Sequence, residues 1–158
     1  MAKFVPNLSE LAAPLRELTH DKVAWCWLPQ HTTAFTKIKD KIAHAPNLRY
    51  YEVTKPVTLT CDASKFGIGA ACLQDGAPVA YASCTMTATE QRYAQIEKEL
   101  LAVVYACRKF HDYIYGKDIV IETDHKPLVT IVKKPLLNAP ARLQSMLLKL
   151  LKYNFTLV

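Results

Sequence analysis

The central part of the chain alternates between apolar and polar positions, as half-buried strands do. The clearest example is Val57-Thr58-Leu59-Thr60-Cys61. Asp75-Gly76 is typical of a two-residue hairpin turn and separates two further alternating segments. The pattern predicts strands at residues 57–61, 68–73, 79–83, 119–123 and 154–158. We therefore expect three consecutive antiparallel strands near the middle of the chain.

Apolar residues three and four positions apart predict helices around these strands. The longest apolar stripe consists of Tyr93, Ile96, Leu100, Val103, Val104 and Cys107. Thr87 and Glu90 have the spacing of a capping box, so we expect the long helix to begin there. Further helices are predicted at residues 7–19, 32–44, 126–132 and 142–152, and a short strand at residues 23–28.

From residue 57 onward the predicted elements follow the order β-β-β-α-β-α-α-β. This order indicates an α/β fold whose sheet is mixed, as in α+β proteins. The sheet has five strands and is flanked by helices. Pro56 marks the change from the helical N-terminal part to the strands, so we expect a division into residues 1–55 and residues 56–158.

Composition excludes several classes of protein. With 51% hydrophobic residues, 22% charged residues and only 4 glycines, the chain can bury a core and is not expected to be disordered. Its apolar stretches are too short to span a membrane, and its start does not resemble a signal peptide. The five widely spaced cysteines suit reduced, buried thiols rather than a disulfide framework or a metal site. We expect an intracellular protein, cytoplasmic or nuclear, with no membrane contact.

The net charge of +6 comes from the C-terminal part, because all 14 acids lie at or before Asp124. From His125 onward there are six bases, namely Lys126, Lys133, Lys134, Arg142, Lys149 and Lys152. A patch of one sign attracts phosphate backbones, although a solvated basic helix face is the commoner meaning of such a run. Lys126, Lys133, Lys134, Arg142 and Lys149 are our candidate contacts to nucleic acid.

Four acidic residues are candidates for chemistry. Asp62 and Asp124 each follow a predicted strand directly, and the two strands would present them together if both lie near the middle of one sheet. Glu97 and Glu99 flank the apolar stripe of the long helix, one on each side, so either could reach the rim of the sheet. The spacing does not choose between these two glutamates. Taken alone, either aspartate is better explained as a residue that caps a turn.

A cluster of three such carboxylates is what Mg²⁺ or Mn²⁺ requires. Carboxylates that share two ions roughly 3.5–4 Å apart can activate water and stabilise the leaving oxyanion in phosphodiester cleavage. Without a metal the cluster would be costly, because like charges raise each other's pKa.

Longer motifs narrow the choice among the possible functions of this chain. The chain contains, in order, DAS-x-x-GIGA from Asp62, PVAY-x-S from Pro78, E-x-x-Y and E-x-E-LLA-V from Glu90, and TDHKPL from Thr123. In this order and spacing they resemble the ribonuclease H domain of gypsy-type retrotransposon reverse transcriptases. Residues 1–55 resemble the end of the polymerase thumb with its linker, and the stretch from Asn138 resembles the sequence that follows in the same family.

The resemblance implies a ribonuclease H-like fold and metal-dependent endonucleolytic hydrolysis of the RNA strand of RNA–DNA hybrids, with two Mg²⁺ or Mn²⁺ ions. Asp62, Glu99 and Asp124 match the family's catalytic, metal-binding carboxylates, so the resemblance favours Glu99 over Glu97. The implied partners are an RNA–DNA hybrid and the remainder of a retroelement polyprotein, including polymerase and integrase.

The sequence departs from the family pattern at three points, the first of which is Cys84, where the family usually has an arginine after Ser83. The family has a fourth catalytic aspartate in a final helix after the fifth strand, whereas this sequence ends at Val158. We therefore expect a C-terminally truncated domain without that helix. The alternative function is a catalytically impaired or inactive, retrotransposon-derived fragment that binds nucleic acid. The polymerase's paired-aspartate motif is also absent, so we expect no polymerisation by this chain.

Overall fold

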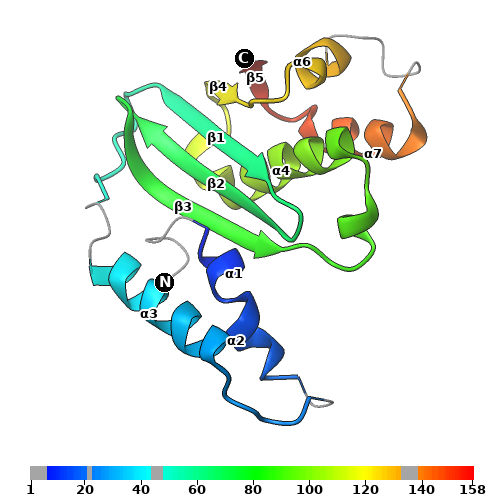
Figure 1. The fold of residues 1–158 in the computed structure, drawn as a ribbon. Coiled ribbons are helices and arrows are strands. Elements are labelled where there is room, and N and C mark those ends of the chain that lie inside the picture. Colours follow the sequence, from blue (N-terminus) through cyan, green and yellow to red (C-terminus); the bar gives the residue numbers. More distant parts are fainter. Residues whose placement is uncertain (1–6, 21–22, 44–47, 133–138) are drawn as a thin grey trace.

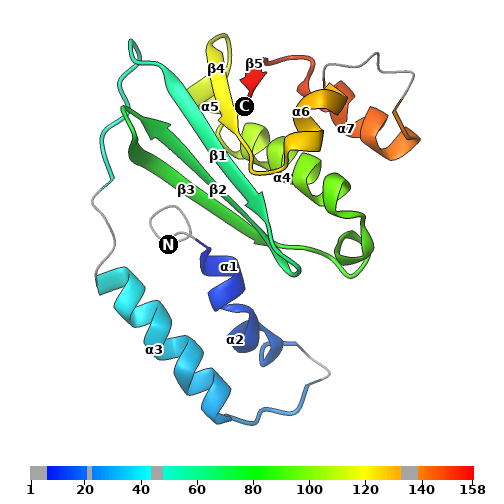
Figure 2. The same ribbon diagram turned by 45° about the horizontal axis from the view of Figure 1, so that its top comes forward.

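A mixed sheet forms the centre of the protein (Figures 1 and 2). The computed structural model describes residues 7–20, 23–43, 48–132 and 139–158. Five strands lie in the order β3-β2-β1-β4-β5. They are β1 (Val57–Ala63), β2 (Gly67–Gln74), β3 (Ala77–Thr85), β4 (Asp118–Glu122) and β5 (Asn154–Leu157). Neighbours among β1, β2 and β3 are antiparallel, whereas β4 runs parallel to β1 and β5 parallel to β4. All five strands lie where the sequence predicted them, but β1 continues to Ala63, so Asp62 lies within this strand, opposite Gly69 of β2, rather than directly after it.

Helices cover both faces of the sheet. The long helix α4 (Gln95–Lys109) packs on one face together with α7 (Ala141–Leu150), as Figure 2 shows. The shorter helices are α1 (Leu8–Leu11), α2 (Ala13–Glu17), the 3₁₀ helix η1 (Glu90–Arg92), α5 (His111–Ile114) and α6 (Lys126–Val132), and the N-terminal part also contains α3 (Pro29–Ala43). None of the helices in the described ranges is long and apolar enough to cross a membrane.

The hydrophobic core lies between the sheet and α4. Val57, Leu59 and Cys61 alternate with more exposed residues along β1, so they all point to the same face of the sheet. On α4, Leu100 and Cys107 lie two turns apart and are fully buried against that face. The period of two along the strand and the helical period along α4 thus build one core.

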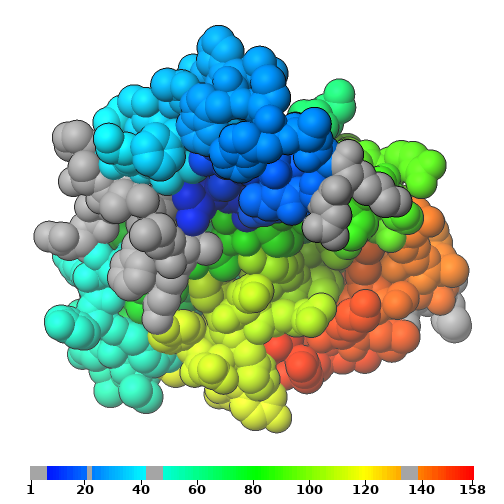
Figure 3. Space-filling model, turned by 90° about the horizontal axis from the view of Figure 1, so that it is seen from below, coloured from blue at the N-terminus to red at the C-terminus, as the bar shows by residue number. Residues whose placement is uncertain are grey.

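Of the N-terminal helices, α1 packs on the opposite face of the sheet, and α2 and α3 pack against α1 and against each other. Ser83 of β3 follows Ala82, which belongs to the core, so Ser83 points away from α4. Both the backbone N–H and the hydroxyl of Ser9 in α1 donate to Ser83 Oγ, at 3.1 Å and 2.9 Å. In Figure 3 the blue atoms of α1 and α2 adjoin the green atoms of the central strands. Contacts therefore cross the predicted division between residues 1–55 and 56–158, which stays a prediction.

Three details differ from the sequence-based prediction in the N-terminal part. The helix predicted at residues 7–19 is interrupted at Ala12, because Pro14 has no N–H to donate to the preceding turn. The strand predicted at residues 23–28 is wrong, since these residues pair with no strand. Instead the Trp25 and Trp27 rings lie 6.1 Å apart and Trp27 Nε1 donates to Thr32 Oγ1 at 2.9 Å.

The start of α4 also differs. Thr87 and Glu90 do form a capping box, in which Glu90 Oε2 accepts from the Thr87 N–H at 2.7 Å and Thr87 Oγ1 from the Glu90 N–H at 3.3 Å. This box opens the short 3₁₀ helix η1 rather than α4. Tyr93 and Ala94 are extended, so α4 begins only at Gln95.

Candidate metal centre

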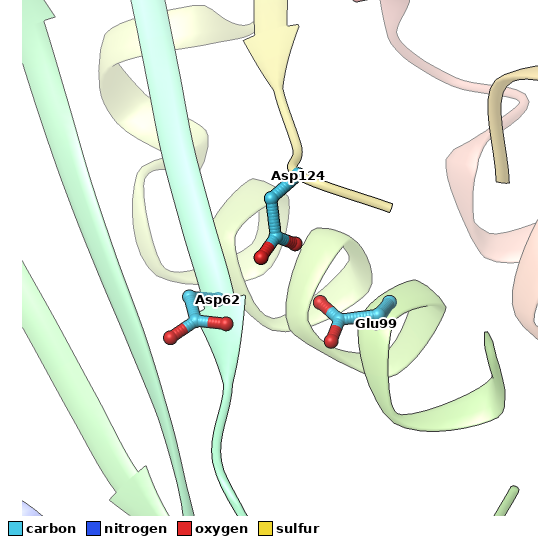
Figure 4. A group of neighbouring side chains, drawn as sticks. All are labelled: Asp62, Glu99 and Asp124. Carbon is cyan, nitrogen blue, oxygen red and sulfur yellow. The ribbon is translucent and has the colours of Figure 1, made fainter. Parts of the chain in front are cut away.

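Two strands and one helix bring three carboxylates together (Figure 4). Thr60 of β1 lies opposite Glu122 of the parallel strand β4, so Asp62 and Asp124, two residues further along, reach the same level. Glu99 joins them from α4. One carboxylate oxygen from each of the three residues lies within 4.8 Å of the other two. Figure 4 shows the three side chains converging on one point.

The three carboxylates have different environments. Asp62 and Asp124 are exposed, whereas Glu99 is only 3% exposed. Glu99 Oε1 accepts a hydrogen bond from Gln95 Nε2, while Glu99 Oε2 is buried and has no hydrogen-bond partner within the described residues. A buried acceptor without a partner is costly unless another group satisfies it.

Burial raises the pKa of Glu99 from 4.5 to about 7. The hydrogen bond from Gln95 acts in the opposite direction, and the neighbouring charges of Asp62 and Asp124 raise the pKa further. The metal-free site therefore holds a carboxyl group that is half protonated near neutrality. A divalent cation would remove this cost, because it favours the ionised form of all three acids.

Glu97 lies outside this group of carboxylates. Both of its side-chain oxygens lie close to Arg142 Nη1 of α7, at 2.8 Å and 2.9 Å. Glu97 Oε2 also accepts the Ala94 N–H at 3.0 Å. The Arg142 guanidinium in turn lies over the Tyr93 ring, 4.3 Å from its centroid. The two glutamates that the spacing could not separate are thus placed differently, with Glu97 tying α4 to α7 and Glu99 facing the aspartates.

The candidate nucleic-acid contacts are scattered. Lys126 begins α6 and is exposed two residues after Asp124. Lys149 lies on α7, beside Arg108 and Lys152 around a shallow hollow. Arg142 is engaged by Glu97, and Lys133 and Lys134 lie outside the described residues. Of the five candidates, Lys126 is the nearest in sequence to the carboxylates, so it is the first one to test.

The donor set favours a hard divalent cation over a thiolate-bound metal. The three converging groups all offer oxygen, which Mg²⁺ and Mn²⁺ prefer. Burial raises the pKa of the Cys61 and Cys107 thiols to about 12, so both stay protonated. Cys72 is buried too and Cys84 is half-buried, but Cys26 is exposed, contrary to the expectation that all five pack as small hydrophobes.

Sequence reasoning missed Gln95, a polar residue at the site. Gln95 contacts Glu99, but a single glutamine near a helix start carries no recognisable signal. His125 follows Asp124, and its Nδ1 is buried with no hydrogen-bond partner in the described part of the chain. Its backbone N–H is held by Thr123 Oγ1 at 3.3 Å, which fixes the turn after β4.

Comparison with known families gives one match over the centre of the chain. The family described as "RNase H-like domain found in reverse transcriptase" matches residues 27–121. Those residues include both β1 and α4, and thus two of the three elements that supply the carboxylates.

Curated relatives are polyproteins of transposons. The Pol polyproteins of transposons 297 and 412 from Drosophila melanogaster are 34% and 32% identical over 97% and 98% of this chain. The Tf2-3 polyprotein of Schizosaccharomyces pombe is 32% identical over 82% of it. This chain spans only 14%, 13% and 10% of these three proteins, respectively.

Solved structures of similar fold come from foamy viral protease–reverse transcriptase. The structure in complex with double-stranded DNA has a TM-score of 0.79 at 28% identity, covering 99% of this chain and 34% of that one. The structure in complex with RNA/DNA hybrid has a TM-score of 0.78 at 28% identity, covering 99% of this chain and 23% of that one. The similarity therefore extends over the N-terminal helices as well as the sheet.

Proposed function

Because the chain belongs to the family of RNase H-like domains found in reverse transcriptases, we propose that it hydrolyses the RNA strand of RNA–DNA hybrids with the help of divalent metal ions. The resemblance to gypsy-type retrotransposons agrees with the matching transposon Pol polyproteins. The mixed sheet with its flanking helices is the ribonuclease H-like fold. Nucleases of this family generally depend on divalent metals.

One observation carries the proposal: Asp62, Glu99 and Asp124 converge within 4.8 Å although they lie far apart in the sequence. Turn-capping aspartates have no reason to meet a buried glutamate, since the three like charges repel one another. A shared cation gives the arrangement a physical reason. We assign the catalytic and metal-binding roles to these three residues, with Mg²⁺ or Mn²⁺ as the cation and two ions as the proposed number.

The three carboxylates would have different roles because they differ in solvent exposure. Asp62 and Asp124 are exposed and would hold the cations where a phosphodiester can approach from solvent. The buried Glu99 would supply a third ligand from α4, on the side of the site that is shielded from solvent. A bound divalent cation would lower the pKa of a coordinated water and neutralise charge that develops on the phosphate. The lower dielectric around Glu99 strengthens each of these electrostatic interactions.

The relatives support a proposal for the substrate and partners. A structure similar to this chain was solved with RNA/DNA hybrid, and the curated relatives are larger polyproteins. We propose an RNA–DNA hybrid as the substrate of this chain, and the remainder of a retroelement polyprotein, with polymerase and integrase, as its setting. Action inside the cell, in the cytoplasm or the nucleus, belongs to the same proposal.

Cleavage of a labelled hybrid tests the proposal. The purified chain should cut the RNA strand in Mg²⁺ or Mn²⁺ and lose at least about 100-fold of its rate with Asp62→Asn or Asp124→Asn. Asp112→Asn, which changes an exposed aspartate of α5, is the matched control. No cutting at any concentration of either metal would contradict the proposal. Salt-sensitive binding of the hybrid without cutting would instead favour a non-catalytic binding module.

A further inference from the structure

Gln95 lies between the end of β1 and the buried carboxylate of Glu99. It is the first residue of α4, and residues four apart share one face of a helix, so its side chain runs beside that of Glu99. Its Nε2 donates to Glu99 Oε1 and lies 3.5 Å from the backbone oxygen of Ala63, the last residue of β1. The two amide hydrogens of one side chain therefore connect α4 to the strand that carries Asp62.

This contact leaves the two oxygens of Glu99 unequal. Oε1 is held by Gln95, while Oε2 is buried and has no hydrogen-bond partner among the described residues. The hydrogen bond to Oε1 favours the carboxylate orientation that preserves it, and in that orientation Oε2 is the oxygen left for a cation. Figure 4 shows this carboxylate directed toward Asp62 and Asp124.

The start of α4 does not need Gln95 as a cap. The Ala94 N–H is already accepted by Glu97 Oε2 at 3.0 Å, and the first turn is closed by the Glu97 N–H, which donates to the Ala94 oxygen at 2.9 Å. Neither contact involves the side chain of Gln95. The Gln95 amide is thus available for orienting Glu99 rather than for stabilising the helix end.

We infer that Gln95 is a positioning residue: it holds Glu99 Oε1 so that Glu99 Oε2 faces the two aspartates as a ready cation ligand. The inference rests on the proposed metal-dependent function and deepens it. Residues that hydrogen-bond to a metal ligand typically change metal affinity or activity by about 10- to 100-fold when they are removed. Because Gln95 is itself exposed, we expect an effect at the low end of that range.

Gln95→Met tests the inference, because methionine keeps the length and helix propensity of glutamine but removes the amide. The matched control is Gln144→Met on α7, whose Nε2 donates to the Ala139 oxygen at 2.8 Å, outside the carboxylate site. Mn²⁺ binding is measured by calorimetry without nucleic acid. Cleavage of the hybrid is followed over a range of Mn²⁺ concentrations, and thermal unfolding is recorded in the metal-free state.

We expect Gln95→Met to weaken Mn²⁺ binding by roughly 10-fold while the melting temperature shifts no more than in the control. At limiting Mn²⁺ its kcat should fall, and about tenfold more Mn²⁺ should restore it with KM for the hybrid unchanged. If the wild-type chain binds Mn²⁺ and cuts the hybrid, but Gln95→Met binds Mn²⁺ with unchanged affinity, the positioning role of Gln95 is wrong. The proposed function itself would stand. A raised KM with unchanged Mn²⁺ affinity would also overturn the positioning role and make Gln95 a substrate contact. A wild-type chain that neither binds Mn²⁺ nor cuts would remove the proposed function together with this inference.

Discussion

The carboxyl group of Glu99 is buried at a position where it faces two aspartates rather than an apolar core. At 3% exposure it has one partnered oxygen and one without a partner in the described residues, and two aspartates lie nearby. Each tenfold change in proton affinity corresponds to 1.36 kcal/mol. A pKa moved from 4.5 to about 7 therefore costs the ionised, metal-free protein on the order of 3 kcal/mol.

The pH dependence of stability follows from the direction of this shift. A raised pKa in the folded state means that Glu99 contributes its stability fully below pH 4.5 and loses it as the pH rises through about 7. Glu99→Gln removes this dependence. In the presence of chelator, we expect the stability of the variant relative to wild type to increase with pH. The difference in free energy of unfolding between the two proteins should grow by up to about 3 kcal/mol from pH 5 to pH 8.

Urea denaturation at the two pH values measures this gain. Glu17→Gln, which alters an exposed glutamate at the end of α2, should show no comparable change. Equal differences between Glu99→Gln and wild type at pH 5 and pH 8 would mean that Glu99 is not destabilised by its burial.

At the level of the elements, hydrophobic periodicity predicted a strand correctly where a neighbouring element buries one of its faces, and local signals were less reliable. The alternation from Val57 to Cys61 predicted β1 because α4 packs against one face of the strand and buries every second side chain. The same alternation around Trp25 failed, because these residues pair with no strand in the described part of the chain and the two tryptophan rings lie tilted toward each other, 6.1 Å apart. The capping box at Thr87 was real, but a box satisfies only one turn and cannot tell a 3₁₀ helix from α4.

The contact between α4 and α7 has a polar part that can be tested. Arg142 meets both oxygens of Glu97 and stacks on Tyr93, with half of its side chain exposed. Because solvent screens such a pair, Arg142→Met should cost only about 0.5–1 kcal/mol of unfolding free energy. Arg108→Met, at an exposed arginine of α4 for which no ion pair is described, is the control.

Hybrid binding by the same variant separates two roles of Arg142. If Arg142 mainly ties α7 to α4, stability falls and the salt dependence of hybrid binding is unchanged. Unchanged stability with weaker hybrid binding would return Arg142 to the group of phosphate contacts that the sequence suggested.

For the whole molecule, the site depends on a topological fact that the sequence implies only in part. The strand pattern predicted β1 and β4, but only their parallel pairing, with Thr60 opposite Glu122, brings Asp62 level with Asp124. Spacing on α4 left Glu97 and Glu99 equal, and the family resemblance alone chose Glu99. Gln95 was beyond prediction, because its role exists only once α4 meets the end of β1.

The distribution of charge over the whole molecule leads to a prediction about how the hybrid approaches. Lys126 is exposed and follows Asp124 by only two residues, so we expect it to contact a phosphate that approaches the carboxylates. Lys37 is also exposed, but it lies on α3, which Figure 1 shows apart from the ends of β1 and β4 that lead to Asp62 and Asp124. Each phosphate contact contributes about one unit to the slope of log affinity against log salt concentration.

We therefore expect Lys126→Gln to weaken hybrid binding and to reduce the salt slope by about one, measured in chelator so that no cleavage occurs. Lys37→Gln carries the same change of charge and should leave both quantities nearly unaltered. If the two variants weaken binding equally, the hybrid is attracted by net charge alone and has no preferred path to Asp62, Glu99 and Asp124. A larger effect of Lys126 would mean that the basic residues after β4 guide the scissile strand to the side of the sheet where the carboxylates converge.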